Sequence, residues 1–309
     1  MNQLDYLVFG SNGFLGSHIL QQINTSPHSS LGVSRGGKDK EILEGEVYSN
    51  YSQEDLDLLL SHTKPKKILI SIGISSINQA ELHPDSRKEV ESALLNIIKA
   101  VKKSSSESTV FLVSSAAVYG NSSNQALSED DKLSPTSFYG EQKVIVERMF
   151  QKFAQINDLN LSIIRIFSVY GPKQKRHVVW DVFSQAKKQN EVVLAGSGKE
   201  IRDFIFVEEL AKQIFELTLV KKHLPDVINL GTGHHVSICE LSKKIITICD
   251  LTTKIFFSQR IDYKNPFSLY PDITRARNLG IVNSNAASLE VGLKITTSKW
   301  NNHEDFINS

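Results

Sequence analysis

Cysteine is scarce in this chain and long hydrophobic runs are absent, and each shortage excludes a class of protein. The two cysteines, Cys239 and Cys249, are too few for a disulfide framework and do not have the spacing of a metal site. We therefore expect two buried thiols in a reducing compartment and no bound metal. No segment approaches the roughly 18 consecutive apolar residues of a membrane span. The N-terminus has neither the basic region nor the cleavage site of a secretory signal, which predicts a cytoplasmic protein with no membrane partner.

An excess of either charge is also lacking. The chain carries 35 lysines and arginines against 34 aspartates and glutamates, a net charge of +1. This balance gives no support to a nucleic-acid or membrane-surface role. With 309 residues, 40% of them hydrophobic, the chain is large enough for one substantial α/β domain and a smaller second one.

Short apolar runs alternate with helix-like patterns over the first 170 residues. The expected strands are residues 4–9, 31–34, 47–49, 66–72, 109–113 and 161–167. The expected helices cover 17–23 and 53–61, begin at Pro84, and include Tyr139. This alternation predicts a Rossmann-type α/β fold with a doubly wound parallel sheet. Beyond Pro172 the alternation loosens, and the run from Arg202 to Val207 is expected to be one strand that leads into a helix.

A glycine-rich turn joins the first expected strand to the first expected helix. It reads Gly10-Ser11-Asn12-Gly13-Phe14-Leu15-Gly16. Gly10 permits a tight turn, Gly13 lets a pyrophosphate approach the backbone, and Gly16 allows the helix to pack closely on the strand. The helix N-terminus offers unpaired N–H groups to an anion. These seven residues are candidate cofactor-binding residues; the alternative is a glycine turn that binds nothing.

The end of the second strand bears on which dinucleotide is bound. NAD-binding folds usually place an acidic residue there for the ribose 2′-hydroxyl. Here Ser34 stands at that place, followed by Arg35. Both side chains can hydrogen-bond a 2′-phosphate, so NADP(H) is favoured over NAD(H), although Arg35 can also be read as a solvated loop cation. Gly73 follows another strand at its carboxyl end, where ligands lie in open α/β sheets.

Tyr139 and Lys143 are four residues apart and therefore share one face of their helix. An ammonium beside a phenol favours the phenolate and lowers a pKa that is about 10 when unperturbed. Such a tyrosine could donate and accept protons near neutral pH. Taken alone, the pair is weak evidence, because many helices carry Tyr and Lys at this spacing.

Several further sequence motifs stand in order along the chain. They are GSNGFLG (10–16), SSAAVYG (114–120), YGEQK (139–143), RIFSVYGP (165–172), RDFIFVEELA (202–211) and NLGTG (229–233). Together they make the chain resemble the extended short-chain dehydrogenase/reductase family over nearly its whole length. The resemblance is to the nucleotide-sugar epimerases, dehydratases and reductases of that family in particular.

This resemblance implies roles for individual residues and a nucleotide-diphosphate sugar as the substrate. Tyr139 would be the catalytic acid/base, with Lys143 lowering its pKa and holding the nicotinamide ribose. Ser115 would hydrogen-bond the sugar oxygen that gains or loses the proton. Arg202 and, as a weaker match, Arg260 would bind the diphosphate, and Ser168 stands where a substrate-binding Asn is frequent.

The resemblance also implies an organisation into domains and an assembly. Residues 1–170, with 205–232 returning to them, would form the dinucleotide-binding domain. Residues 171–204 and 233–309 would form the nucleotide-sugar domain. A homodimer is expected through the helices Pro84–Lys103 and Tyr139–Phe153.

Departures from the family pattern narrow the expected reaction. Family 4,6-dehydratases have acidic residues after the catalytic Ser or Thr, where this chain has Ala116 and Ala117. Dehydration is therefore disfavoured. The Ser34-Arg35 pair favours an NADPH-dependent 4-ketoreductase. The phrase GKEIRDFIFVEELA resembles that of reductases that make deoxyhexose nucleotides for surface polysaccharides, which implies a place in that biosynthesis. The alternative is a 4-epimerase that keeps NAD bound. A cofactor-sensing regulator is less favoured, because the chain retains Ser115, Tyr139 and Lys143.

Overall fold

The computed structural model describes residues 3–35, 45–73, 84–121, 125–221, 223–260, 266–282 and 288–302. The chain divides into two compact units. The first consists of Met1–Gly120, Lys132–Ile166 and Ala211–Ile228, and the second of Asn121–Asp131, Phe167–Leu210 and Asn229–Ser309. The assignment of cofactor and substrate binding to separate domains stays a prediction.

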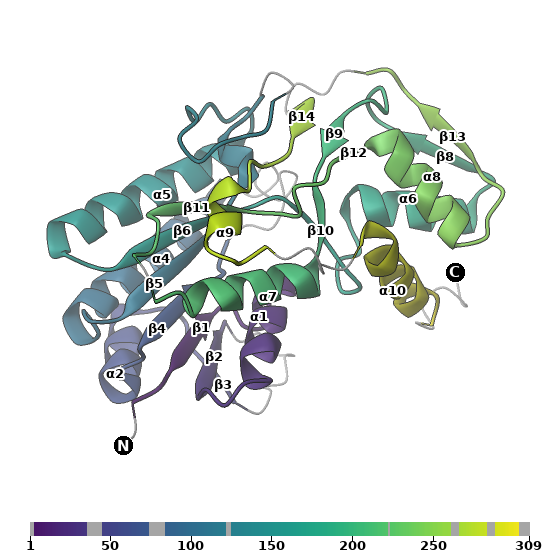
Figure 1. The fold of residues 1–309 in the computed structure, drawn as a ribbon. Helices are drawn as coiled ribbons and strands as arrows, with labels where there is room; N and C mark the ends of the chain where they lie inside the picture. The colour runs from purple at the N-terminus through teal and green to yellow at the C-terminus, as the bar shows by residue number, and fades with distance from the viewer. Residues whose placement is uncertain are drawn as a thin grey trace. The chain divides into compact units, whose positions relative to one another are not determined.

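The first unit is built on a seven-stranded sheet with the order β11-β6-β5-β4-β1-β2-β3 (Figure 1). The strands of this sheet are β1 (Tyr6–Phe9), β2 (Ser30–Ser34), β3 (Glu46–Tyr48), β4 (Lys67–Ile70), β5 (Thr109–Ser115), β6 (Leu161–Ile166) and β11 (Val227–Leu230), the last shared with the second unit. The paired strands from β3 to β6 are all parallel. The predicted Rossmann-type sheet is therefore confirmed.

The strand order reverses between β1 and β4. In open α/β sheets a ligand binds outside the carboxyl ends of the strands at such a reversal. Phe9, the last residue of β1, pairs in register with Val33 of β2 and with Ile70 of β4. The turns that follow these strands consequently begin at the same edge of the sheet.

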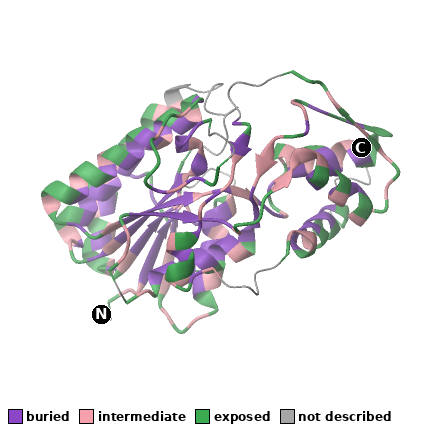
Figure 2. Cartoon of the chain, turned by 45° about the horizontal axis from the view of Figure 1, so that its top comes forward, coloured by how far each residue is buried: buried purple, intermediate pink, exposed green. Residues whose placement is uncertain are grey.

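Helices cover both faces of this sheet, with their buried sides turned toward the strands (Figure 2). They are α1 (Phe14–Asn24), α2 (Gln53–Thr63), α4 (Pro84–Ser104), α5 (Phe138–Asn157) and α7 (Val207–Thr218), the last shared with the second unit. Leu7 and Phe9 of β1 pack in one core cluster with residues of α2, α4 and α5. Tyr6 faces the other side, where its ring lies 6.0 Å from that of Phe215 in α7. Each such fully buried side chain contributes about 1.5–3 kcal/mol, which makes this core the main stabilising feature of the unit.

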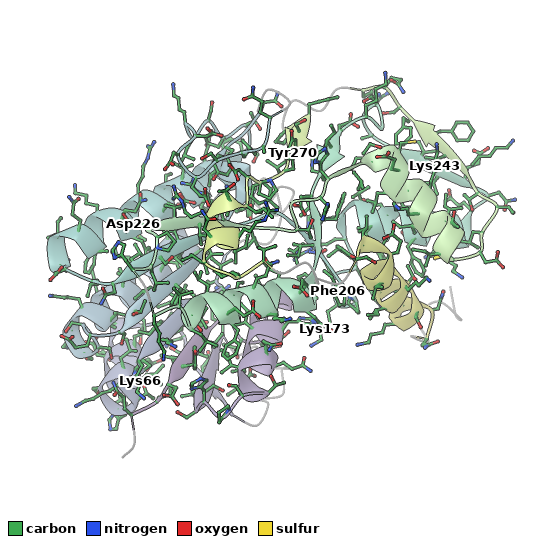
Figure 3. The ribbon with its side chains drawn as sticks, viewed as in Figure 1. Lys66, Lys173, Phe206, Asp226, Lys243 and Tyr270 are labelled. Carbon is green, nitrogen blue, oxygen red and sulfur yellow. The ribbon has the colours of Figure 1, made fainter. Side chains whose placement is uncertain are left out.

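The second unit combines short sheets with four helices in its described part. Its helices are α6 (His177–Lys188), α8 (Ile238–Ile248), α9 (Thr274–Asn278) and α10 (Leu289–Asn301). Its strands are β7 (Ser168–Tyr170), β8 (Glu191–Leu194), β9 (Ile201–Arg202), β10 (Phe204–Phe206), β12 (Val236–Ser237), β13 (Lys254–Phe257) and β14 (Ser268–Leu269). Trp300 of α10 packs against Trp180 and Phe183 of α6, each at 5.0 Å between ring centroids. Phe206, labelled in Figure 3, lies 5.9 Å from the Tyr170 ring.

The run from Arg202 to Val207 is not one strand, contrary to the sequence prediction. Arg202 ends β9, which pairs with β12 and β14, whereas Phe204 begins β10, which pairs with β7. Asp203 separates them, and its carboxylate accepts hydrogen bonds from the backbone of Thr232 and Gly233. These bonds hold the chain at Asp203, so the two strands enter different sheets.

The two cysteines are only partly buried, which corrects the expectation of two buried thiols. Cys239 lies in the first turn of α8, and Cys249 is the residue that caps its end. Positions ten residues apart along a helix are separated by about 15 Å, which is too far for a disulfide. Both thiols are free. Within the described ranges, no helix is both long and apolar enough to cross a membrane.

Candidate active site

The glycine turn lies at the reversal of the sheet. Gly10 has φ +82°, and a side-chain carbon there would come within 2.5 Å of the Ser71 carbonyl oxygen after β4. A carbon on Gly16 would come within 2.1 Å of the Gly10 carbonyl oxygen. Glycine is therefore required at both places, and α1 begins close against the end of β1. This geometry agrees with the roles expected for Gly10 and Gly16.

The same turn has two features that fit a dinucleotide pyrophosphate. Gly13 is the N-cap of α1 and supplies no side chain to accept from the first-turn amides. Those amides are free to meet an anion, which the positive end of the helix attracts. Ser11 is 1% exposed, and its hydroxyl has no hydrogen-bond partner in the described part of the chain. A buried hydroxyl without a partner is costly unless a ligand supplies one.

The end of β2 places Ser34 and Arg35 beside this turn. Ser34 is buried, and its carbonyl accepts from the amide of Ser49 at 3.1 Å, whereas Arg35 is exposed. Sequence reasoning missed Tyr51, whose hydroxyl donates to the carbonyl of Val33 at 3.5 Å. Burial raises the pKa of Tyr51 to about 12, against the charge of Arg35, which favours the phenolate. The cation thus lies near the carboxyl end of β2, and its contact with a ribose phosphate stays a prediction.

Ser115 and the Tyr139 helix meet at the carboxyl end of β5. Ser115 is the last residue of β5, and its Oγ accepts from the amide of Ala117 at 3.2 Å in the 3-10 turn η1 (Ala116–Val118). Helix α5 begins after Ser137, whose Oγ accepts from the amide of Gly140 at 3.2 Å. Both serines therefore fix the backbone on which the candidate catalytic residues stand.

Lys143 connects α5 to the sheet. Its Nζ donates to the carbonyl of Val113 in β5 at 3.2 Å and lies 5.9 Å from the centroid of the Tyr139 ring. It also lies 3.1 Å from where a side-chain carbon on Gly73 would be. The structure thus brings Lys143 together with Tyr139, with Gly73 after β4, and with the strand that ends in Ser115.

Besides Ser115, the candidate substrate residues are Ser168, Arg202 and Arg260, which belong to the second unit. The Arg202 guanidinium donates to the carbonyls of Ile201 at 2.7 Å, Phe267 at 3.1 Å and Pro266 at 2.5 Å. Burial lowers the pKa of Arg202 to about 10, with the charge of Glu200 acting in the opposite direction. In this structure Arg202 therefore organises the backbone at 266–267. A phosphate contact for it stays a prediction.

Ser168 and Arg260 are less constrained. Ser168 begins β7 and is half-buried, and its amide donates to the carbonyl of Asp203 at 3.1 Å. Arg260 is exposed, and its amide donates to Ser258 Oγ at 3.4 Å. Their proposed contacts with substrate also stay predictions. No cluster of potential metal ligands occurs in the part of the chain that the structure describes.

Asp203 was not predicted as a site residue, although it stands in the RDFIFVEELA motif. It is 0% exposed, and it accepts from the amide and hydroxyl of Thr232 and from the amide of Gly233 at 2.7–3.1 Å. It therefore fixes the Gly231-Thr232-Gly233 turn after β11. The sequence indicates this role only indirectly. A single carboxylate inside an apolar run is rarely buried unless hydrogen-bond donors surround it.

Comparison with known proteins matches this architecture. The family model described as "NAD dependent epimerase/dehydratase family" matches residues 6–231. An uncharacterized UDP-glucose epimerase of Bacillus subtilis, YtcB, is 28% identical over 305 residues, covering 93% of this chain and 95% of that protein. The UDP-glucose 4-epimerase of Thermotoga maritima, solved with UDP-glucose, has a TM-score of 0.85 at 21% identity, covering 96% of this chain and 99% of its own.

A second solved structure is that of the Thermus thermophilus UDP-glucose 4-epimerase in complex with NAD. Its TM-score is 0.83 at 19% identity, with 97% of this chain and 99% of that chain covered. The structural likenesses show the shared fold, and the family model extends over most of the chain. This protein belongs to the NAD dependent epimerase/dehydratase family, within the extended short-chain dehydrogenases/reductases.

Proposed function

We propose that this chain is a nucleotide-sugar 4-epimerase. The observation that carries the proposal is the placement of Lys143 between Tyr139 and the strand that ends in Ser115. The similarity to UDP-glucose epimerases supports it. This order of preference reverses the one drawn from sequence, in which the 4-ketoreductase came first.

The residues present fit a dinucleotide, which when bound supplies reversible hydride acceptance at its nicotinamide ring. Tyr139 would accept the proton of the sugar hydroxyl when that carbon is oxidised to a carbonyl. It would return the proton when the carbonyl is reduced again from its other face. Ser115 Oγ already accepts from Ala117, so its own hydrogen is available to the sugar oxygen. Lys143 places a positive charge 5.9 Å from the centroid of the Tyr139 ring.

Elimination of water would need a further acid or base. The two positions after Ser115 are Ala116 and Ala117, which carry no titratable group. Ala117 contributes only backbone groups to the turn. The site therefore supports proton transfer coupled to hydride transfer rather than dehydration.

The acid/base role is tested by Tyr139→Phe. Removal of a positioned general acid/base costs about 10²–10⁴-fold in turnover. We expect a loss of that size with UDP-glucose and related nucleotide-sugars, measured by product analysis, while dinucleotide affinity measured by calorimetry is unchanged. Tyr48→Phe makes the same chemical change at a tyrosine that is 53% exposed on β3, and should leave turnover unaffected. Full turnover in the Tyr139 variant would refute the mechanism.

A second candidate function is the NADPH-dependent 4-ketoreductase. The observation that favours it is Ser34-Arg35 at the end of β2, where a carboxylate would disfavour a 2′-phosphate. The dinucleotide that co-purifies with the protein separates the two candidates. Tightly held NAD with no net oxidation supports the epimerase. Stoichiometric consumption of NADPH with a 4-keto sugar nucleotide supports the reductase.

The Arg35→Glu variant tests the phosphate contact itself. A guanidinium that binds the 2′-phosphate contributes a charge-assisted hydrogen bond that NADH cannot use. We expect affinity for NADPH to fall about tenfold or more and affinity for NADH to change little, as measured by fluorescence titration. Lys243→Glu, which makes the same change in net charge at an exposed position of α8, is the control. Equal losses for the two dinucleotides would exclude the contact.

A further inference from the structure

A buried ion pair lies one helical turn beyond Lys143. Glu147 is 1% exposed and Arg165 of β6 is 4% exposed. Arg165 Nε lies 3.2 and 3.3 Å from the two carboxylate oxygens of Glu147, and its second donor nitrogen, NH2, lies 2.9 Å from Oε2. Tyr139, Lys143 and Glu147 follow one another at four-residue spacing on one face of α5.

This pair reaches the strand that ends in Ser115. The hydroxyl of Ser114, the residue before Ser115, donates to Glu147 Oε1. The other terminal nitrogen of Arg165 donates to the hydroxyl of Tyr119 at 2.9 Å, just after η1. The guanidinium carbon lies 4.9 Å from the Tyr119 ring centroid. Glu147 and Arg165 thus join α5, β5, β6 and the end of the turn that Ser115 begins.

Stability alone does not explain such a pair. Desolvation of two charges offsets most of their attraction, and apolar residues of similar volume often serve a fold equally well. Burial by itself would lower the pKa of Arg165, but hydrogen bonds and charge from Glu147 raise it above its ordinary value. The pair instead supplies directional hydrogen bonds, because a planar guanidinium and a carboxylate bind each other only in a narrow range of relative positions.

The segment between these contacts is held at three places. A side-chain carbon on Gly140 would come within 2.5 Å of the Ala117 carbonyl oxygen, so the first turn of α5 lies directly on η1. Lys143 donates to Val113 in the next turn. Glu147 contacts Ser114 in the turn after that. Sliding or rotation of α5 along β5 would break the third contact even where the first two could adjust.

We propose that Glu147 is a positioning residue, which through Ser114 and Arg165 holds the Tyr139–Lys143 segment of α5 in register with Ser115. The inference rests on the proposed catalytic function of those three residues. Glu147 touches neither reacting atoms nor cofactor in this proposal. It acts by holding the acid/base where a misplacement of about 1 Å costs about 10²-fold in rate.

The test is Glu147→Gln, which keeps the length of the side chain and removes its charge. We expect kcat to fall about 10–100-fold while KM for the nucleotide-sugar stays within about threefold, because the candidate diphosphate ligand Arg202 is untouched. Amide hydrogen exchange should accelerate at 115–118 and 138–143. Glu147→Asp, which keeps the charge but shortens the reach, should show a smaller loss and serves if the glutamine variant does not fold.

Tyr6→Phe is the control for a loss of stability alone. Its hydroxyl is buried at the amino end of β1, whereas the candidate site lies at the carboxyl ends of the strands. The hydroxyl lies 2.9 Å from Thr218 Oγ1 and 3.0 Å from Lys67 Nζ. We expect it to destabilise the first unit without changing kcat or exchange at 138–143. The proposal is overturned if a folded Glu147 variant keeps full kcat, if Tyr6→Phe reproduces the loss, or if exchange at 138–143 does not change. If the wild type converts no nucleotide-sugar, the proposed function fails, and the exchange measurement alone decides the positioning role.

Discussion

At the scale of single residues, Asp203 shows how burial and hydrogen bonds compete for one proton. Burial raises the pKa of Asp203 to about 6, although hydrogen bonds from Thr232 and Gly233 favour the carboxylate. An unfolded aspartate titrates near 3.9, so the folded protein holds this proton more tightly. The stability that the protonated form contributes is present in full below about pH 4 and is lost as the pH rises through 6.

Asp203→Asn removes this titration and tests it. The free energy of unfolding of the wild type, relative to the variant, should fall by about 2 kcal/mol between pH 4 and pH 7, since two pKa units are worth about 2.7 kcal/mol over the whole titration. Urea unfolding at a series of pH values measures the difference. A difference that is flat with pH would show that the carboxylate is not perturbed in this way.

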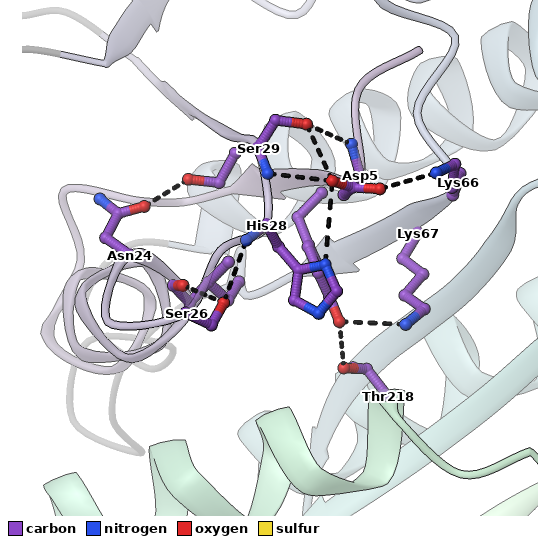
Figure 4. A network of polar contacts seen from close by, with 11 residues as sticks. Asp5, Asn24, Ser26, His28, Ser29, Lys66, Lys67 and Thr218 are labelled. Atoms are coloured by element: carbon purple, nitrogen blue, oxygen red, sulfur yellow. Dashed lines mark hydrogen bonds and ion pairs between the residues drawn. The ribbon is translucent and has the colours of Figure 1, made fainter. Parts of the chain in front are cut away.

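At the scale of elements, a polar cluster ties together the amino ends of the three adjacent strands β2, β1 and β4 (Figure 4). Asp5, which precedes β1, accepts from the amide of Ser29 before β2 at 3.0 Å and from Lys66 before β4 at 2.8 Å. The hydrogen bond from Lys66 first, and those from Ser29 next, lower the pKa of Asp5 to about 2. Because the folded pKa lies below the unfolded value, this contribution exists above about pH 4 and is lost as the pH falls toward 2.

Asp5→Asn should lower the free energy of unfolding by about 1 kcal/mol at pH 7. The value is small because the Lys66 side chain is 54% exposed and solvent screens its charge. The loss should vanish by about pH 2 in acid-unfolding curves. Asp226→Asn, at an exposed aspartate that likewise precedes a strand, is the matched control. If the variant is still less stable than the wild type at pH 2, the charge of Asp5 is not the cause of the lost stability.

Elements were predictable where one short pattern determines them. The strands expected at 66–72 and 109–113 are the parallel strands Lys67–Ile70 and Thr109–Ser115, and the stripe of Val90, Leu94 and Ile97 is the buried side of α4. The division at Asp203 was not predictable, because the donors that hold it are 29 and 30 residues further along the chain. Its neighbours Arg202 and Phe204 read as continuous strand by local pattern alone.

At the scale of the whole molecule, recognisable motifs identified the family but not the contacts between them. Gly10 and Gly16 adopt the tight turn and the close packing that their spacing indicates, and Tyr139 and Lys143 share one face of α5. Their roles toward cofactor and substrate stay predictions. The pairing of Glu147 with Arg165 joins residues 18 apart through the packing of α5 on β6, which no local pattern encodes. The expected homodimer and the choice of dinucleotide stay predictions.

The position of β11 has a consequence for synthesis of the chain. This strand is the outermost in the large sheet beside β6, yet its residues, Val227–Leu230, come after the segment 167–210 of the second unit. On the ribosome, β6 therefore has an open edge while that whole segment is made. An unpaired strand edge is a site for wrong pairing between nascent chains. The nascent protein thus passes through an interval of exposure to chaperones or to aggregation, which ends only when Leu230 has emerged.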